Sequence, residues 1–249
     1  MADDAMPVLQ ARGIRKVYGT LVALESADLD VGQSEIVGLI GPNGSGKSTL
    51  LHVISGRTPA TAGTVVLGGR DVTHAKPSTR IRHGLSIKFQ LARVYLDLTV
   101  ADNLLLALQS TTPLAALILS RTRTKAAPAI DRLLEEFHLA AARDQLAREL
   151  SHGEQQWLEI AMAMALDPTV LLLDEPTAGM SHEERVATGE RIRAAGQRCG
   201  VLIVEHDLDF IRGLCHRINV LHQGRIIASG TPAQIEADAR VQEVYLTRV

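Results

Sequence analysis

The sequence predicts an α/β fold that carries a β-rich flank and a helical insertion. Short apolar segments with the length of buried strands alternate with helical segments over much of the chain, which is typical of a mostly parallel sheet covered by helices. Two strand-like segments near the N-terminus and a helical block from about residue 99 to residue 146 fall outside that alternation. We therefore expect a core with a mostly parallel sheet, an antiparallel β flank and a helical subdomain.

The expected strands are apolar runs bounded by turn-forming residues, and the expected helices carry apolar residues three or four positions apart. In chain order, strands are predicted at residues 8–19, 22–32, 34–40, 63–72, 84–90, 169–175, 200–206, 217–223 and 225–230. Helices are predicted at residues 47–55, 100–108, 127–139, 141–149, 183–195 and 207–215, and a further helix follows the polar turn at residues 150–153.

Composition argues for a folded chain and against several functional classes. Hydrophobic residues make up 46% of the 249 residues, so a full core is expected, in one large domain or two small ones. The net charge of −2 provides no basic excess for a nucleic-acid partner. Cys199 and Cys215 have no metal-site spacing and are expected to be packing residues of a reduced cytosolic protein. The acidic N-terminus predicts no signal peptide, and the apolar run at 113–120 is too short to span a bilayer.

Residues 41–49, GPNGSGKST, fit the pattern G-x-x-x-x-G-K-[ST] between an expected strand and an expected helix. The glycines let the backbone curl so that its N–H groups face one point, where the helix N-terminus adds partial positive charge. Lys47 is expected to reach the β- and γ-phosphates, and Ser48 to offer its hydroxyl to Mg²⁺. The motif therefore predicts a nucleoside triphosphate site, with the binding residues Gly41, Pro42, Asn43, Gly44, Ser45, Gly46, Lys47, Ser48 and Thr49.

Two carboxylates, Asp174 and Glu175, follow the apolar strand that is predicted at residues 169–175. Ligands of open α/β sheets bind at this carboxyl end of the strands. Asp174 is expected to hold Mg²⁺ through water. Glu175 points differently, because strand side chains alternate, and is placed to act on water beside the γ-phosphate. The pair predicts hydrolysis, which needs positioning and charge stabilisation more than covalent chemistry.

Four motifs, GPNGSGKST, LSHGEQ, VLLLDEPTAG and VEHD, resemble in order and spacing those of the ATP-binding cassette (ABC) transporter ATPases. The resemblance covers nearly the whole chain. It implies a P-loop NTPase fold, ATP and Mg²⁺ as ligands, and ATP hydrolysis coupled to transport. It also implies a single ABC ATPase domain, residues 1–249, with a RecA-like core at about 1–90 and 166–249 and a helical subdomain at about 91–165.

The resemblance assigns roles to three further residues. Gln90 matches the glutamine that touches Mg²⁺ and the attacking water and signals to the membrane subunit, and His206 matches the switch histidine at the γ-phosphate. Tyr18 stands where the family places an aromatic ring against adenine, and such a ring stacks on a base at little entropic cost. The implied catalytic set is Lys47, Gln90, Glu175 and His206, and the implied metal set is Ser48, Gln90 and Asp174.

Ser151 and Gly153 of the LSHGEQ turn are implied to contact the γ-phosphate that a partner chain holds. Apolar residues at i, i+3, i+4 and i+7 after the turn predict a helix anchored on its own subdomain. A complete site then requires two chains, as a head-to-tail homodimer or as a heterodimer with a second ABC ATPase. Two departures from the family pattern are Ser181 in place of a D-loop aspartate and His152 in place of a glycine. His152 is either a tolerated surface substitution or a contributor of a hydrogen bond or partial charge near the partner's nucleotide.

The run LSHGEQQWLEIAMAMALDPTVLLLDEPTAGMS resembles the ATPases of branched-chain amino acid and urea or short-chain amide importers. The implied partners are two integral-membrane permease subunits, contacted near Arg93, Val94 and Tyr95, and indirectly a periplasmic or extracellular solute-binding protein. The implied location is peripheral, on the cytoplasmic face of the membrane. The short segment after residue 230 leads us to expect no separate regulatory domain.

Two alternatives remain open. A related subgroup works in lipopolysaccharide export and resembles the chain in layout, although its signature normally keeps two glycines. Some ABC ATPases act instead in DNA repair, chromosome handling or translation. One cassette, no sustained heptads and no basic surface argue against that class and against a nucleic-acid partner. Neither the cargo nor the choice between import and export follows from the sequence alone.

Overall fold

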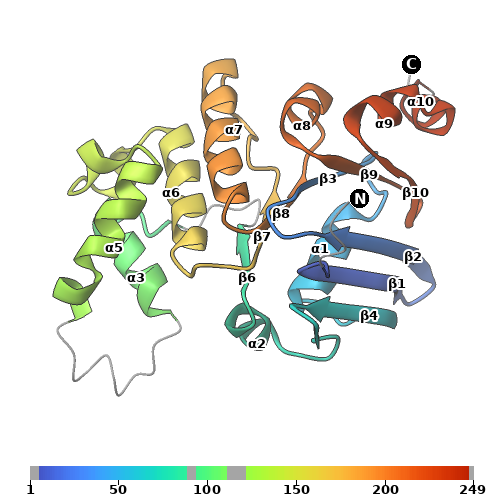
Figure 1. The fold of residues 1–249 in the computed structure, drawn as a ribbon, viewed down its shortest axis with the longest axis horizontal. Helices are drawn as coiled ribbons and strands as arrows, with labels where there is room; N and C mark the ends of the chain where they lie inside the picture. Colours follow the sequence, from blue (N-terminus) through green and yellow to red (C-terminus); the bar gives the residue numbers. More distant parts are fainter. Residues whose placement is uncertain (1–5, 89–93, 111–121, 247–249) are drawn as a thin grey trace.

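The computed structural model describes residues 6–88, 94–110 and 122–246 (Figure 1). Within these residues the strands form one sheet in the order β5-β4-β1-β2-β10-β9-β3-β8-β7-β6. The strands are β1 (Leu9–Tyr18), β2 (Leu21–Val31), β3 (Ile36–Ile40), β4 (Ala62–Leu67), β5 (Arg70–Asp71), β6 (Leu85–Lys88), β7 (Val170–Asp174), β8 (Gly200–Val204), β9 (Arg217–His222) and β10 (Arg225–Gly230).

The sheet has a parallel half and an antiparallel flank, as expected from the sequence. Strands β6, β7, β8, β3 and β9 pair in parallel, while β1, β2, β4 and β5 pair antiparallel and β10 joins the two parts. The helices are α1 (Lys47–Ser55), α2 (Pro77–Arg82), α3 (Val100–Gln109), α5 (Thr122–Glu136), α6 (His152–Met164), α7 (His182–Gly196), α8 (Leu208–Leu214), α9 (Pro232–Ala237) and α10 (Ala239–Leu246).

Alternate residues of the parallel strands belong to two hydrophobic clusters on the two faces of the sheet. Leu171 and Leu173 of β7 pack in a cluster that includes residues of α6, α7 and α8. Val170 and Leu172 of the same strand pack with residues of α1 and of the β flank. This period of two explains why the strands are continuously apolar, since both faces are covered.

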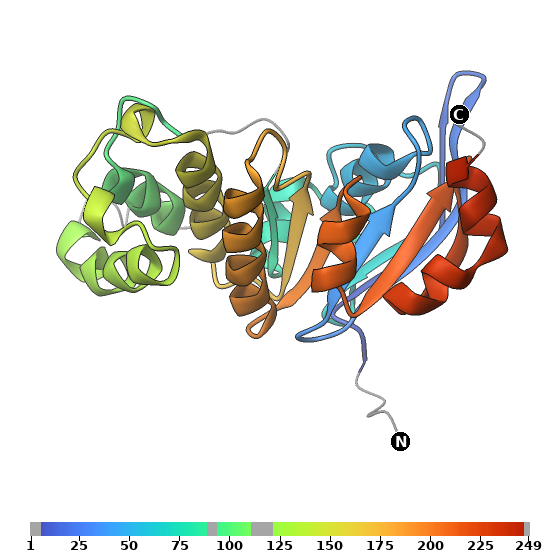
Figure 2. The same ribbon diagram turned by 90° about the horizontal axis from the view of Figure 1, so that it is seen from above.

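Helices α3, α5 and α6 lie together at one end of the molecule, and α7 stands beside α6 (Figures 1 and 2). The cluster behind β7 also contains Leu104 of α3, Leu133 of α5 and Leu158 of α6, so the helical block shares its core with the sheet. Within the described ranges, no helix is long and apolar enough to cross a membrane.

Three local predictions were wrong or incomplete. The strand predicted at 63–72 is a hairpin of β4 and β5. The helix predicted at 141–149 is two 3-10 turns, at Ala140–Ala142 and Ala147–Glu149. Two carbonyls of this segment accept hydrogen bonds from the start of α3 instead: Val100 N donates to Gln145 O, and Ala101 N donates to Arg143 O. Helices α2, α9 and α10 were not predicted, although α2 and α9 each start at a proline, a common first helical residue.

Candidate functional site

The loop of residues 41–46 joins β3 to α1 and is built around glycines. A side chain at Gly41 would place its Cβ 2.1 Å from Leu221 O, and one at Gly46, where φ is +110°, would lie 2.7 Å from Ala23 O. Leu50 N donates to Gly46 O, so α1 begins directly behind the loop. The loop therefore brings backbone N–H groups to the positive end of a helix, which is the geometry that binds phosphate.

Lys47 and Ser45 supply further donors to this loop. Lys47 Nζ is 2.7 Å from Gly41 O and 3.1 Å from Pro42 O, to which it donates hydrogen bonds. Ser45 Oγ is buried and has no hydrogen-bond partner among the described residues. A buried hydroxyl without a partner is costly unless a ligand satisfies it. The loop thus fits the phosphates of ATP, which provide several oxygen acceptors.

Asp174 at the end of β7 and Ser48 at the start of α1 line the same cavity of about 700 Å³. Burial, and next the charge of Glu175, raise the pKa of Asp174 to about 6, while Lys88 and Lys47 oppose the shift. A carboxylate and a hydroxyl are hard oxygen ligands of the kind that Mg²⁺ prefers. Within the described ranges, no three His, Cys, Asp or Glu side chains gather as a metal cluster.

Glu175 turns the chain out of β7. Its φ is +46°, in a region that non-glycine residues seldom occupy, and its N–H donates to Val204 O of the neighbouring strand. Such strain persists where the surrounding structure holds it, and functional sites are common places for it. Because β7 ends at Asp174, the strand alternation from which we predicted the direction of Glu175 does not extend to it, and this bend sets its backbone instead.

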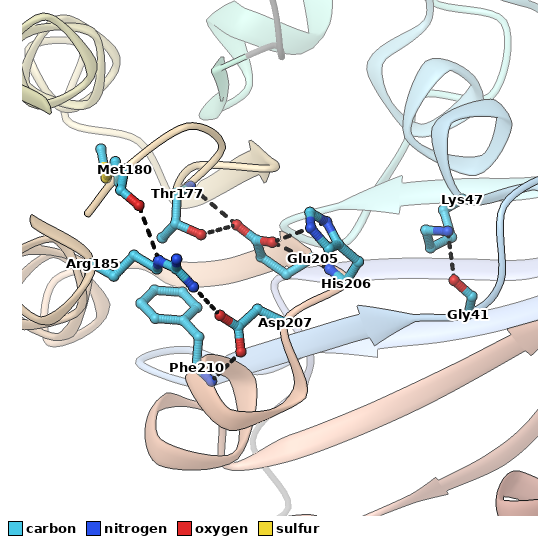
Figure 3. Close-up of polar contacts among 9 residues, drawn as sticks. All are labelled: Gly41, Lys47, Thr177, Met180, Arg185, Glu205, His206, Asp207 and Phe210. Atoms are coloured by element: carbon cyan, nitrogen blue, oxygen red, sulfur yellow. Dashed lines mark hydrogen bonds and ion pairs between the residues drawn. The ribbon is translucent and has the colours of Figure 1, made fainter. Parts of the chain in front are cut away.

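His206 follows strand β8, which lies between β3 and β7 in the sheet. Its side chain is 67% exposed, and its Nδ1 is 3.6 Å from Glu205 Oε2 (Figure 3). Glu205 is buried and its Oε1 accepts hydrogen bonds from Thr177 N at 3.0 Å and Thr177 Oγ1 at 2.6 Å. Sequence reasoning gave Glu205 no role, although a glutamate directly after a buried apolar strand was a visible signal.

A second chain of contacts starts at Asp207 (Figure 3). Its carboxylate caps α8 by accepting from Phe210 N and also accepts from Arg185 at 2.7 Å. Arg185 Nε donates to Met180 O at 3.2 Å. The segment that follows His206 is thereby tied to the loop that follows Glu175.

The LSHGEQ turn begins α6 with a reciprocal cap. Ser151 Oγ accepts from Glu154 N at 3.2 Å, and Ser151 N donates to Glu154 Oε2 at 2.9 Å. Figures 1 and 2 show α6 and α1 on either side of β6 and β7. The structure does not bring Ser151 and Gly153 together with the phosphate loop of their own chain. His152 Nε2 lies 3.0 Å from Ala178 O of the same chain, a contact that sequence reasoning missed.

The remaining predicted residues lie at the edges of the site or outside the described ranges. Tyr18 ends β1 beside the turn to β2. The residue is 45% exposed, and Lys16 Nζ is 4.7 Å from the centroid of its ring. Tyr95 is exposed, and Val94 packs partly against the core. Gln90 and Arg93 lie outside the described residues.

Comparisons with known proteins agree with this geometry. Residues 24–178 match the family model described as ABC transporter, and residues 225–246 match the one described as branched-chain amino acid ATP-binding cassette transporter. The lipopolysaccharide export system ATP-binding protein LptB of Escherichia coli is 36% identical over 97% of this chain and 98% of its own length. The high-affinity branched-chain amino acid transport ATP-binding protein LivG of Salmonella typhimurium is 34% identical, over 97% and 98%.

A solved structure of the ADP conformation of an ATP-binding cassette of an ABC transporter superposes with a TM-score of 0.84 at 28% identity, covering 97% of this chain and 99% of the other. One family model spans more than half of the chain, and the curated relatives match over nearly their whole length. The chain therefore belongs to the ATP-binding proteins of ABC transporters, which bind ATP and couple its hydrolysis to transport.

Proposed function

We propose that this protein is the ATP-hydrolysing subunit of an ABC importer for branched-chain amino acids or for urea and short-chain amides. The observation that carries the choice is the match of residues 225–246, β10 through α10, to the branched-chain amino acid transporter model. LivG, at 34% identity, supports the same choice. The turn of residues 150–153 and the Trp-Leu-Glu-Ile run after it resemble this subgroup as well.

Lipopolysaccharide export is the second candidate, because LptB is 36% identical over an equal span. The two candidates predict different partners and cargo. Deletion of the gene in its own organism, followed by uptake assays with radiolabelled leucine and urea, tests the choice. Loss of either uptake, restored by the intact gene and not by a Lys47→Ala form, supports import. Normal uptake of both, with lipopolysaccharide accumulating at the inner membrane, overturns it in favour of export.

For hydrolysis we propose that Lys47 and the N–H groups of residues 41–49 bind the phosphates while Tyr18 stacks on adenine. Ser48 and Asp174, with Gln90, would hold Mg²⁺, which neutralises charge on the phosphates when bound. Glu175 orients the attacking water, and His206 contacts the γ-phosphate. The cavity shared by Ser48 and Asp174 and the bend at Glu175 support this division of roles.

We further propose that two chains form each ATP site, as a homodimer or with a second ABC ATPase. Ser151 and Gly153 would face the nucleotide of the partner, since they begin α6 rather than lining the phosphate loop of their own chain. Glu175→Gln is expected to bind ATP without hydrolysing it and to accumulate as a dimer in gel filtration with ATP and Mg²⁺. The variant is tested alone and mixed with any second ABC ATPase encoded beside its gene. If it binds ATP yet stays monomeric at saturating ATP in both cases, the two-chain site is wrong.

The helical block at about 91–165 is proposed as the part that meets two membrane subunits, from the cytoplasmic face. Asn103 supports this, because its buried amide accepts from Tyr95 N at 2.7 Å and donates to Tyr95 O at 3.1 Å, which fixes the backbone of an exposed tyrosine. Such a ring is an anchor of the kind that interfaces use. Pull-down from detergent-solubilised membranes should recover two polytopic proteins, in amounts that fall with Tyr95→Ala. Recovery of ribosomes or DNA instead would contradict a transport role.

A further inference from the structure

The turn that we propose faces the partner chain is joined, within its own chain, to the loop that follows Glu175. We call residues 150–153 the signature turn and residues 177–181 the D-loop. His152 Nε2 of the signature turn is 3.0 Å from Ala178 O of the D-loop. A backbone carbonyl only accepts hydrogen bonds, so the Nε2 of His152 must carry the proton in this contact. A glycine at position 152 would have no group that reaches Ala178.

A second contact uses Glu184 at the start of α7. Glu184 Oε2 accepts from Ser181 N at 2.9 Å, and Ser181 Oγ accepts from Glu184 N at 3.2 Å, so the pair caps α7. A Cβ at Gly153 would lie 2.4 Å from Glu184 Oε1. Hydrogen bonds from Ser181 and, more weakly, from Gly153 N–H lower the pKa of Glu184. One carboxylate therefore lies against both the D-loop serine and the signature turn.

A third contact joins the bodies of the two helices. Trp157 Nε1 of α6 donates to Thr188 Oγ1 of α7 at 2.8 Å, and Thr188 Oγ1 is 3.2 Å from Met180 Sδ of the D-loop. Thr188 is fully buried, so this link excludes water. The signature turn and the D-loop are consequently connected at their tips by His152 and at their bases by Trp157 and Thr188.

We propose that His152 is a positioning residue for ATP hydrolysis, which couples the signature turn to the D-loop so that both meet the partner chain as one rigid unit. This rests on the proposed two-chain site. His152 is exposed, and its contact reaches the middle of the D-loop at Ala178, whereas the contact of Glu184 reaches the end of that loop at Ser181. Loss of the His152 contact leaves the Glu184 and Trp157 contacts in place but releases the middle of the D-loop, at Ala178, from the signature turn.

The structure also accounts for Ser181 in the D-loop. Its hydroxyl and N–H are both used in the cap with Glu184, so it holds the base of the loop in place. His152 then holds the tip through Ala178 O. In this chain the geometry of the D-loop is set by contacts within the subunit, and a charged residue at position 181 is unnecessary for it.

The test compares His152→Ala with His152→Gln, since a glutamine Nε2 can donate to the same carbonyl. His182→Ala is the matched control, because His182 is an exposed histidine at the first position of α7 as His152 is of α6. The readouts are kcat and KM for ATP hydrolysis and the Kd of the monomer for a fluorescent ATP analogue. Each substitution is also made in the Glu175→Gln protein, and the ATP concentration at which half of that protein is dimeric is measured.

His152→Ala is expected to lower kcat by about three- to tenfold, the loss of one hydrogen bond from the assembled site. It should raise the ATP concentration for dimerisation and leave the monomer Kd unchanged. His152→Gln and His182→Ala should stay within about twofold of the parent. Unchanged kcat in His152→Ala, or an equal loss of kcat in His152→Gln, overturns the inference. If the parent Glu175→Gln protein still dimerises with ATP, the two-chain site is unaffected by that result. A parent Glu175→Gln protein that never dimerises overturns the two-chain site and this inference with it.

Discussion

Lys88 and Glu159 form an ion pair buried between β6 and α6. Lys88 Nζ is 3.7 Å from Glu159 Oε2, and the two side chains are 2% and 8% exposed. Burial lowers the pKa of Lys88, and the charges of Glu159 and, less strongly, of Asp174 oppose that shift. The pair therefore ties the strand that leads to Gln90 to the helix that begins with the signature turn, beside the carboxylate proposed to hold Mg²⁺.

We predict that replacing one residue of this pair lowers the free energy of unfolding far more than replacing both. Lys88→Met removes the ion-pair partner of buried Glu159 and one of the two lysines that act on Asp174, and should lower the free energy of unfolding by about 3–5 kcal/mol. The double variant Lys88→Met, Glu159→Met should recover most of that loss, because neither charge is left behind. Urea unfolding of the two single variants and the double variant measures the coupling. Additive losses would show that the two side chains do not interact energetically.

Arg80 is predicted to stabilise the helix behind the phosphate loop. It is 2% exposed, and its guanidinium donates to Val53 O and Ile54 O at the C-terminus of α1 and to Thr73 O and Ala75 O. Arg80→Met removes the hydrogen bonds of the guanidinium to these four carbonyls and should cost about 3 kcal/mol or more. Arg82 is an exposed residue of α2, the helix that also carries Arg80, and Arg82→Met should change stability by less than about 0.5 kcal/mol. Chemical denaturation of both variants checks this, and equal midpoints would refute it.

Asp174 is predicted to make the metal-free protein less stable as the pH rises. Its pKa of about 6 in the fold lies above the ordinary 3.8, so between these values the folded chain binds the proton more tightly than the unfolded chain. The stabilising contribution is complete at low pH and is lost as the pH rises through 6, with ~1 kcal/mol lost between pH 5 and 8.

Asp174→Asn removes this titration and serves as the comparison at each pH. In EDTA at pH 8 it should unfold at higher urea than the parent, and at pH 5 the difference should shrink. With ATP and Mg²⁺ the order should reverse, since the parent alone gains binding energy from the carboxylate. Parallel stability curves for the two proteins from pH 5 to 8 would show that Asp174 has no raised pKa.

The sequence was most informative where chemistry and topology coincide. Lys47, Asp174 and His206 lie at or after the ends of apolar strands, and parallel strands end at one edge of a sheet, so the strand assignments alone predicted that these residues lie at that edge. The charge of Lys47 does act on Asp174 in the structure. Part of the antiparallel flank was also predictable, since β1 and β2 stand together before the first helix, while β4 and β5 follow α1 and were predicted as one strand. Helix α1 begins and ends at the predicted residues, because the phosphate loop and Gly56 mark its two ends.

The missed features depend on partners far away in the chain. His152 contacts a carbonyl 26 residues later, and Glu205 holds Thr177, 28 residues earlier, so neither contact has a local pattern. Residues 141–149 have helical composition, yet the start of α3 takes up carbonyls at Arg143 and Gln145 and prevents a regular helix. Tertiary hydrogen bonds outweighed local propensity there.

Tyr18 is predicted to contribute to nucleotide affinity through its ring rather than its hydroxyl. The residue is 45% exposed at the end of β1, and Lys16, which lies over the ring, is a surface side chain, so a base can stack on the ring without rearrangement of the core. Base–aromatic stacking is worth about 1–3 kcal/mol, so Tyr18→Ala should weaken ATP binding by roughly five- to a hundredfold. Tyr18→Phe should bind like the parent. Tyr95→Ala, which removes a tyrosine that is 57% exposed in the helical block, should leave ATP affinity unchanged and serves as the matched control. Equal affinities for the parent and Tyr18→Ala, measured by fluorescent nucleotide titration, would remove Tyr18 from the site.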